Sequence, residues 1–124
     1  KKKNNKVNGT YSAWFDKGVV EGGAAAYFNG IHPTYDLHAG ESETGFGLMR
    51  YPELLDKAQI ASLKPNYEGE FLFERIGAGA KDFIECGAPD AYFGDPAAAT
   101  AENADKQYDV FSDYVVDEVR ALLG

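Results

Sequence analysis

The sequence has little of what builds several common kinds of site. Cys86 is its only cysteine, which excludes an internal disulfide bond and a zinc site made from several cysteines. A single cysteine suits a reducing compartment, so we expect a cytoplasmic protein. None of the 124 residues lies in an apolar run approaching the ~20 residues that a membrane-spanning helix needs, and we expect no membrane partner.

Positive charge is also scarce. Lysine and arginine total 12 against 20 aspartates and glutamates, so the formal net charge is −8. Nucleic-acid phosphates and anionic lipid headgroups are bound by basic surfaces, which this balance disfavours. The sequence therefore predicts that neither nucleic acid nor a membrane surface is a partner.

The sequence does contain enough apolar material for one core. Hydrophobic residues make up 44% of the chain and aromatic residues 14%, and 124 residues suit one ordinary domain. There is no internal repeat or linker, so we expect residues 1–124 to form a single domain. A mixture of β-branched and aromatic residues predicts a strand at 7–15, and partial alternation of apolar and polar residues predicts one at 67–76. A second short strand at 82–86 would pair with the latter in a hairpin. The glycine-rich stretch 18–37 predicts an ordered connection with one helical turn.

Two helices are also expected. A short apolar pattern over 41–51 predicts a helix that ends at Pro52. The clearer helix is predicted over 99–123, with Asp95 as its N-cap and Pro96 at its first position. Its apolar residues recur at three- and four-residue steps; they are Tyr108, Phe111, Val115, Val119 and Leu122.

Chemically versatile side chains are concentrated in one stretch, HAGESET at 38–44. Histidine has the unperturbed pKa nearest neutral, which makes His38 a candidate general acid or base. If the stretch is helical, His38 and Glu41 share one face, at the spacing of histidine–carboxylate metal pairs. If His38 lies before the helix, Glu43 can reach back to it from the first turn, where the helix dipole favours a carboxylate. An exposed histidine beside an ordinary helix start is the third reading, and the residues leave all three open.

Two motifs resemble the C-terminal half of the creatininase (creatinine amidohydrolase) family. DLHAGESET at 36–44, followed by LM at 48–49 and YPELL at 51–55, is similar to the family's His-x-Gly-x-x-Glu-Thr motif and the phrase that ends its helix. GDP at 94–96 and ATAE at 99–102 resemble the second signature, which precedes the last helix. YSAWFD at 11–16 resembles a strand end with an aromatic residue that covers the substrate. The resemblance thus extends over nearly the whole chain.

This resemblance implies a three-layer α/β/α fold of which the chain is the C-terminal part, with a long amphipathic C-terminal helix. It implies an amidohydrolase that cleaves a cyclic amide or another non-peptide C–N bond. His38 would be the catalytic general acid/base and Glu43 would orient it. The residues that would contact a small-molecule amide substrate are Trp14, Tyr35 and Asp36. Without the resemblance, the default role of the single tryptophan is packing in the core.

The metal-binding half of such a site is missing from the sequence. The family binds two divalent metals of the zinc or manganese class through a Glu-x-His, an aspartate and an Asn-Gly-His-x-Glu phrase, and these phrases do not occur here. The resemblance therefore implies metal ligands outside this chain, in a complementing chain or a homo-oligomer. Leu37 replaces an acid before the family's motif histidine, which argues against creatinine itself, and Glu41 takes no role from the resemblance. The rival hypothesis is a non-catalytic ligand-binding or interaction subunit.

Overall fold

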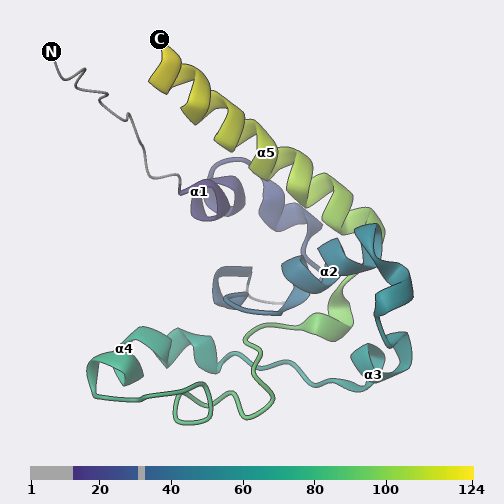
Figure 1. The fold of residues 1–124 in the computed structure, drawn as a ribbon, viewed down its shortest axis with the longest axis vertical. Coiled ribbons are helices and arrows are strands. Elements are labelled where there is room, and N and C mark those ends of the chain that lie inside the picture. Colours follow the sequence, from purple (N-terminus) through teal and green to yellow (C-terminus); the bar gives the residue numbers. More distant parts are fainter. Residues whose placement is uncertain (1–12, 31–32) are drawn as a thin grey trace, which may run out of the picture.

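The computed structural model describes residues 13–30 and 33–124, and within them the chain is built from helices joined by loops (Figure 1). The α-helices are α1 (Trp14–Val20), α2 (Glu41–Arg50), α3 (Lys57–Ser62), α4 (Leu72–Gly77) and α5 (Ala101–Leu123). Short 3-10 turns lie at Ala24–Tyr27, Pro33–Tyr35, Pro52–Leu54, Glu68–Phe71 and Pro96–Ala98. None of the helices in these ranges is long and apolar enough to cross a membrane.

Helix α5 is the longest element and packs against both α1 and α2 (Figure 1). The side chain of Thr100 caps its N-terminus, where Oγ1 accepts a hydrogen bond from the Asn103 N–H at 3.1 Å. Its buried positions recur at three- and four-residue steps; they are Ala104, Gln107 and Phe111. The long C-terminal helix is therefore confirmed, with its start at Ala101. The helix predicted over 41–51 is confirmed as α2.

The predicted N-cap of the last helix, Asp95, is wrong. Pro96 opens a separate 3-10 turn, and Asp95 makes no side-chain capping hydrogen bond there. Ala99 then adopts an extended backbone, with φ −64° and ψ 138°, which ends this turn before the helix begins. Because the long helix starts after that break, the side chain placed to cap it is Thr100.

The main core lies where α1, the turn Ala24–Tyr27 and α5 meet. Its buried residues and the apolar side chains packed on them are Val19, Ala24, Phe111, Trp14, Phe15, Phe28, Tyr108 and Val110. The close approach of α2 to α5 depends on Gly45, since a Cβ atom there would lie 2.9 Å from Cβ of Ala104. A second, smaller core near α4 contains Cys86, Ala88 and Phe93.

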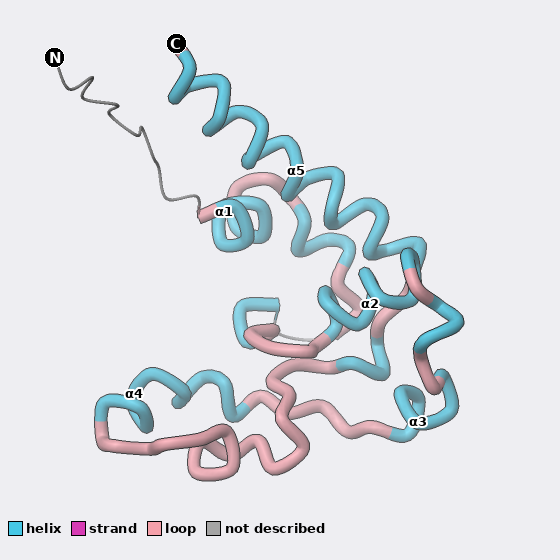
Figure 2. The backbone as a smooth tube through the Cα atoms, viewed as in Figure 1, coloured by secondary structure: helices cyan, strands magenta, loops and turns pink. Residues whose placement is uncertain are grey.

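The predicted strands are wrong where the structure describes them. The stretch 67–76 folds into the turn Glu68–Phe71 and helix α4, and 82–86 forms turns. Of the stretch 7–15, positions 7–12 lie outside the described residues, and Trp14 and Phe15 begin α1. Figure 2 shows helices and loops throughout the described chain, whose β-type pairing amounts to two isolated bridges. The α/β fold class is therefore not confirmed by these residues.

The physical reason is that a strand needs a partner, whereas a helix forms its hydrogen bonds locally. At the end of the 67–76 stretch, the Ala78 N–H donates to the carbonyl of Glu74 at 2.9 Å, which closes a helical turn. A strand with alternating apolar residues would bury Phe71 and Phe73 on one face, but Phe71 is 41% exposed and Phe73 is 76% exposed. Of the connection predicted over 18–37, the described residues 18–30 and 33–37 hold the end of α1 and two 3-10 turns rather than one helical turn.

Candidate functional site

A cleft of about 250 Å³ opens where α1, the loop before α2, the start of α2 and α5 meet. Its lining residues are Trp14, Phe15, Asp36, Leu37, Ser42, Glu43 and Tyr108. Three site residues expected from the sequence, Trp14, Asp36 and Glu43, therefore lie around one cleft, although Trp14 is distant in the chain from the other two. Aromatic rings with a few polar groups between them are the usual lining of a small-molecule site.

The loop before α2 is shaped by the Asp36 carboxylate, which caps the helix from outside. Asp36 Oδ1 accepts a hydrogen bond from the Glu41 N–H at 2.5 Å, and Oδ2 accepts one from the Ser42 N–H at 3.0 Å. These N–H groups belong to the first turn of the helix, where backbone N–H groups have no carbonyl partner within the helix. Gly40 makes this possible, because a Cβ atom there would lie 1.9 Å from Asp36 Oδ1.

Glu43 reaches back from the first turn of α2, although the reading from the sequence had it reach His38 itself. Its Oε2 accepts a hydrogen bond from the Ala39 N–H at 2.5 Å, so the group it reaches is the backbone beside His38. Ala39 has a positive φ of 46°, which is uncommon for a residue other than glycine. The side chain of Glu43 remains exposed and lines the cleft.

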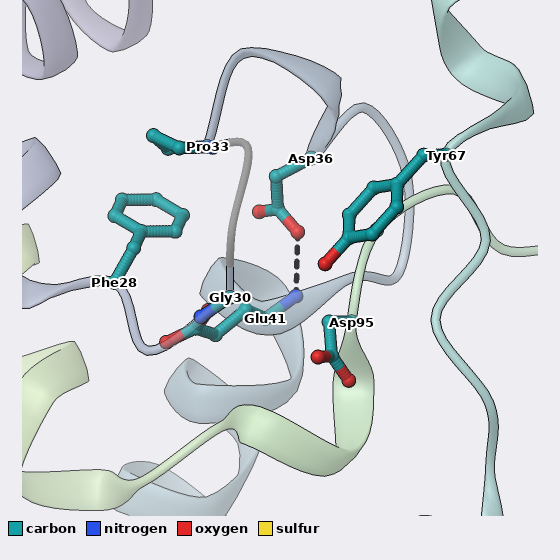
Figure 3. Close-up of a pocket in the computed structure, with 8 residues that line it drawn as sticks. Phe28, Gly30, Pro33, Asp36, Glu41, Tyr67 and Asp95 are labelled. Atoms are coloured by element: carbon teal, nitrogen blue, oxygen red, sulfur yellow. Dashed lines mark hydrogen bonds between the residues drawn. The ribbon is translucent and has the colours of Figure 1, made fainter.

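Glu41, which took no role from the family resemblance, connects another loop to the start of α2. It is 2% exposed, and its two carboxylate oxygens accept hydrogen bonds from the N–H groups of Asn29 at 2.5 Å and Gly30 at 2.6 Å. Figure 3 shows Glu41 and Asp36 beside a small cavity that Tyr67 and Asp95 also line. Glu41 thus joins the 29–30 loop to the start of α2.

Burial raises the pKa of the Asp36 carboxyl to about 6. The hydrogen bonds from the Ser42 and Glu41 N–H groups oppose this rise, and the negative charges of Glu43 and Asp95 add to it. Burial also raises the pKa of Glu41, against its two backbone hydrogen bonds. The cleft is therefore lined by a carboxyl group that exchanges its proton not far below neutral pH, a common property of functional sites.

A divalent metal does not fit the described acidic residues. Asp36, Glu41 and Asp95 surround a cavity of about 10 Å³, which is about the room of one water molecule. The oxygens of Asp36 and Glu41 are already occupied by backbone N–H groups. Across residues 13–30 and 33–124, no group of three His, Cys, Asp or Glu side chains could hold a metal ion.

His38 lies before α2 and not on it, so the shared helix face with Glu41 does not form. Its backbone pairs with Phe93: the Phe93 N–H donates to the His38 carbonyl at 2.8 Å. The imidazole is exposed, with its centroid 5.0 Å from that of the Phe83 ring, and it is not among the residues that line the cleft. Tyr35 closes the 3-10 turn just before Asp36 and is likewise not part of the lining.

Sequence reasoning missed four residues that line the cleft, namely Phe15, Leu37, Ser42 and Tyr108. Tyr108 was assigned to the apolar pattern of the long helix, and part of its ring does pack in the core. The signal that could have separated it is its hydroxyl, because an aromatic residue with a polar end is suited to the border of a core. Ser42 lies inside the HAGESET stretch, between two glutamates whose carboxylates were the stronger candidates for chemistry.

The comparison with family models agrees with the resemblance. The model described as Creatininase: Creatinine amidohydrolase matches residues 5–119, which is nearly the whole chain. This range includes both the stretch at the start of α2 and the stretch that precedes α5. Among curated proteins and solved structures, none matches the chain.

Proposed function

This chain belongs to the creatininase family, and on that basis we propose that it forms the substrate-binding wall of an amidohydrolase site. The reaction would be hydrolysis of a cyclic amide or another non-peptide C–N bond. The observation that supports the proposal is the cleft, which unites Trp14 of α1 with Asp36 and Glu43 at the start of α2. We further propose that residues 1–124 are the C-terminal part of one three-layer α/β/α domain.

Within this site each residue has a distinct task. The Trp14 ring covers a planar amide from one side, because an aromatic face and a flat conjugated group stack well. Glu43 holds the Ala39 N–H and thereby fixes the backbone next to His38. His38 does not line the cleft but directly follows Leu37, which does, and we propose that its exposed imidazole takes and returns the proton of the C–N cleavage.

The metal of the site would come from elsewhere. Members of the family typically depend on a divalent metal, and the described residues of this chain do not fit one. We therefore propose that ligands for an ion of the zinc or manganese class lie outside this chain, in a complementing chain or a second copy. When bound, such an ion supplies Lewis acidity to hydrolysis.

Turnover by the complete assembly that contains this chain tests the assigned roles. We expect His38→Ala to lower kcat by about 100-fold or more and Glu43→Gln by about tenfold, with unchanged helical circular dichroism. Glu102→Gln is the matched control, because it also removes a carboxylate charge from a first helical turn but lies outside the cleft. If His38→Ala turns over substrate at the rate of the unaltered chain, its assignment is wrong.

A non-catalytic ligand-binding subunit is the second candidate. The observation that favours it is the occupation of the Asp36 and Glu41 oxygens by backbone N–H groups. Binding of cyclic amides by the chain, combined with absence of hydrolysis in the metal-replete assembly, would establish this alternative.

A further inference from the structure

Tyr108 differs from the other cleft residues because its ring packs against aromatic side chains while its polar end lies at the cleft. The ring is fixed by two aromatic neighbours: its centroid lies 4.8 Å from that of Phe46 and 5.5 Å from that of Phe111, the latter edge-on. The residue is half-buried and lines the cleft together with Trp14. The aromatic part is therefore held in place while the polar end lies at the cleft.

Ser42 is a polar neighbour of the Tyr108 hydroxyl, and hydrogen bonding from its side chain would favour the ionised phenol and so lower its pKa. Ser42 is 2% exposed and sits in the first turn of α2, so this neighbour is rigid. Burial raises the pKa of the Tyr108 phenol, and the nearby carboxylates of Glu43 and Asp36 raise it further, against the effect of Ser42. The phenol is thus neutral at physiological pH and keeps lone pairs for a further partner.

Each polar side chain around the cleft can accept a hydrogen bond, and the hydroxyl groups among them can also donate one. These polar groups comprise the carboxylates of Asp36 and Glu43 and the hydroxyls of Ser42 and Tyr108, and the lining residues include no lysine or arginine. The oxygens of Asp36 are already bound by backbone N–H groups. A ligand that brings an N–H group into this cleft is therefore matched, whereas one without it leaves an acceptor unpaired.

We propose that Tyr108 determines substrate specificity: its phenol oxygen, oriented by Ser42, accepts a hydrogen bond from an N–H group of the substrate. The cleft would then select amides that bear an N–H over N-alkylated amides of the same shape. This inference rests on the proposed function, because it names the substrate class of the same site. Rejection of a ligand that lacks one hydrogen-bonding group is a strong form of discrimination.

The test measures binding to the chain itself and needs no turnover. Trp14 is the only tryptophan and lines the cleft, so its fluorescence reports on a ligand there. The probes are 2-pyrrolidinone, which has an amide N–H, and N-methyl-2-pyrrolidinone, which does not. Tyr108→Phe removes the hydroxyl and keeps the ring that packs on Phe46. Tyr114→Phe is the matched control, because it removes a hydroxyl from the same helix at a position outside the cleft lining.

We expect Tyr108→Phe to raise the Kd of 2-pyrrolidinone about three- to tenfold and to leave that of the N-methyl compound unchanged. Tyr114→Phe should change neither. Ser42→Ala should shift the N–H probe in the same direction, which provides a second variant if Tyr108→Phe has altered circular dichroism. Equal effects on both probes, or no effect on either, would overturn the role of Tyr108 while leaving the proposed function in place. Failure of the unaltered chain to bind either probe would overturn both.

Discussion

Asp36 is buried and also caps α2, and the two have opposite effects on the pKa of its carboxyl group. Burial raises the pKa of its carboxyl from 3.8 to about 6, although two N–H groups of α2 donate to it. Replacement by asparagine keeps the shape of the side chain and removes the titration. We therefore expect the difference in unfolding free energy between the unaltered chain and Asp36→Asn to depend on pH.

The size of this effect follows from the shift. Because the folded-state pKa lies above the unfolded value, the folded chain binds the proton more tightly. The resulting stability is fully present below about pH 4 and is lost as pH rises through about 6. A shift of about two units corresponds to about 3 kcal/mol, since one unit is about 1.4 kcal/mol. Asparagine also loses one of the two accepted N–H bonds, which costs about 1 kcal/mol at every pH.

Urea unfolding followed by circular dichroism between pH 4 and pH 7 measures the difference. The advantage of the unaltered chain over Asp36→Asn should fall by up to about 3 kcal/mol across this range. Glu41, whose pKa is also raised by burial, is present in both proteins, so the subtraction isolates the position at 36. Asp90→Asn in an exposed turn is the matched control. A difference that stays constant, or that grows with pH, would refute the reasoning.

Two further predictions concern the helices that position the site. Gly45→Val should cost about 1–3 kcal/mol, because its Cβ atom meets Ala104 across the α2–α5 contact. Gly77→Ala is the control, since a Cβ atom there meets nothing within 4 Å; equal stability of both variants in urea would contradict this packing. Thr100→Ala should cost about 1 kcal/mol and Asp95→Ala less, because Thr100 caps α5. Thermal unfolding compares the two, and a larger loss from Asp95→Ala would restore the cap expected from the sequence.

The helices that depend on local residue patterns could be predicted from the sequence. The apolar recurrence along 101–123 and the proline that ends α2 depend on neighbouring residues, and both helices are where the patterns predicted them. Asp95 and Thr100 are both good capping residues, so composition could not choose between them. The extended backbone of Ala99 separates the turn at Pro96 from α5, so that Thr100 is the cap. That conformation cannot be predicted from the residue types.

Features that depend on distant contacts were not predictable in the same way. The strand pattern at 67–76 could not establish that 82–86 would pair with it, and the described chain folds it into local helical turns. Asp36 was expected to contact a substrate, but its capping bonds to α2 appear only once Gly40 lets the loop fold back. Tyr108 lines the cleft because α5 packs against α2 there. Local periodicity in the sequence does not predict such a contact between helices.

We propose that this cleft belongs to a metal-dependent amidohydrolase site. The most direct test of this proposal is the rate of cyclic-amide hydrolysis by the complete assembly before and after removal of divalent metal with a chelator. We expect turnover that is lost on chelation, returns with zinc or manganese, and falls about tenfold when Glu43 is replaced by glutamine. A metal-replete assembly that hydrolyses no cyclic amide, or hydrolysis that is indifferent both to chelation and to Glu43→Gln, would contradict it.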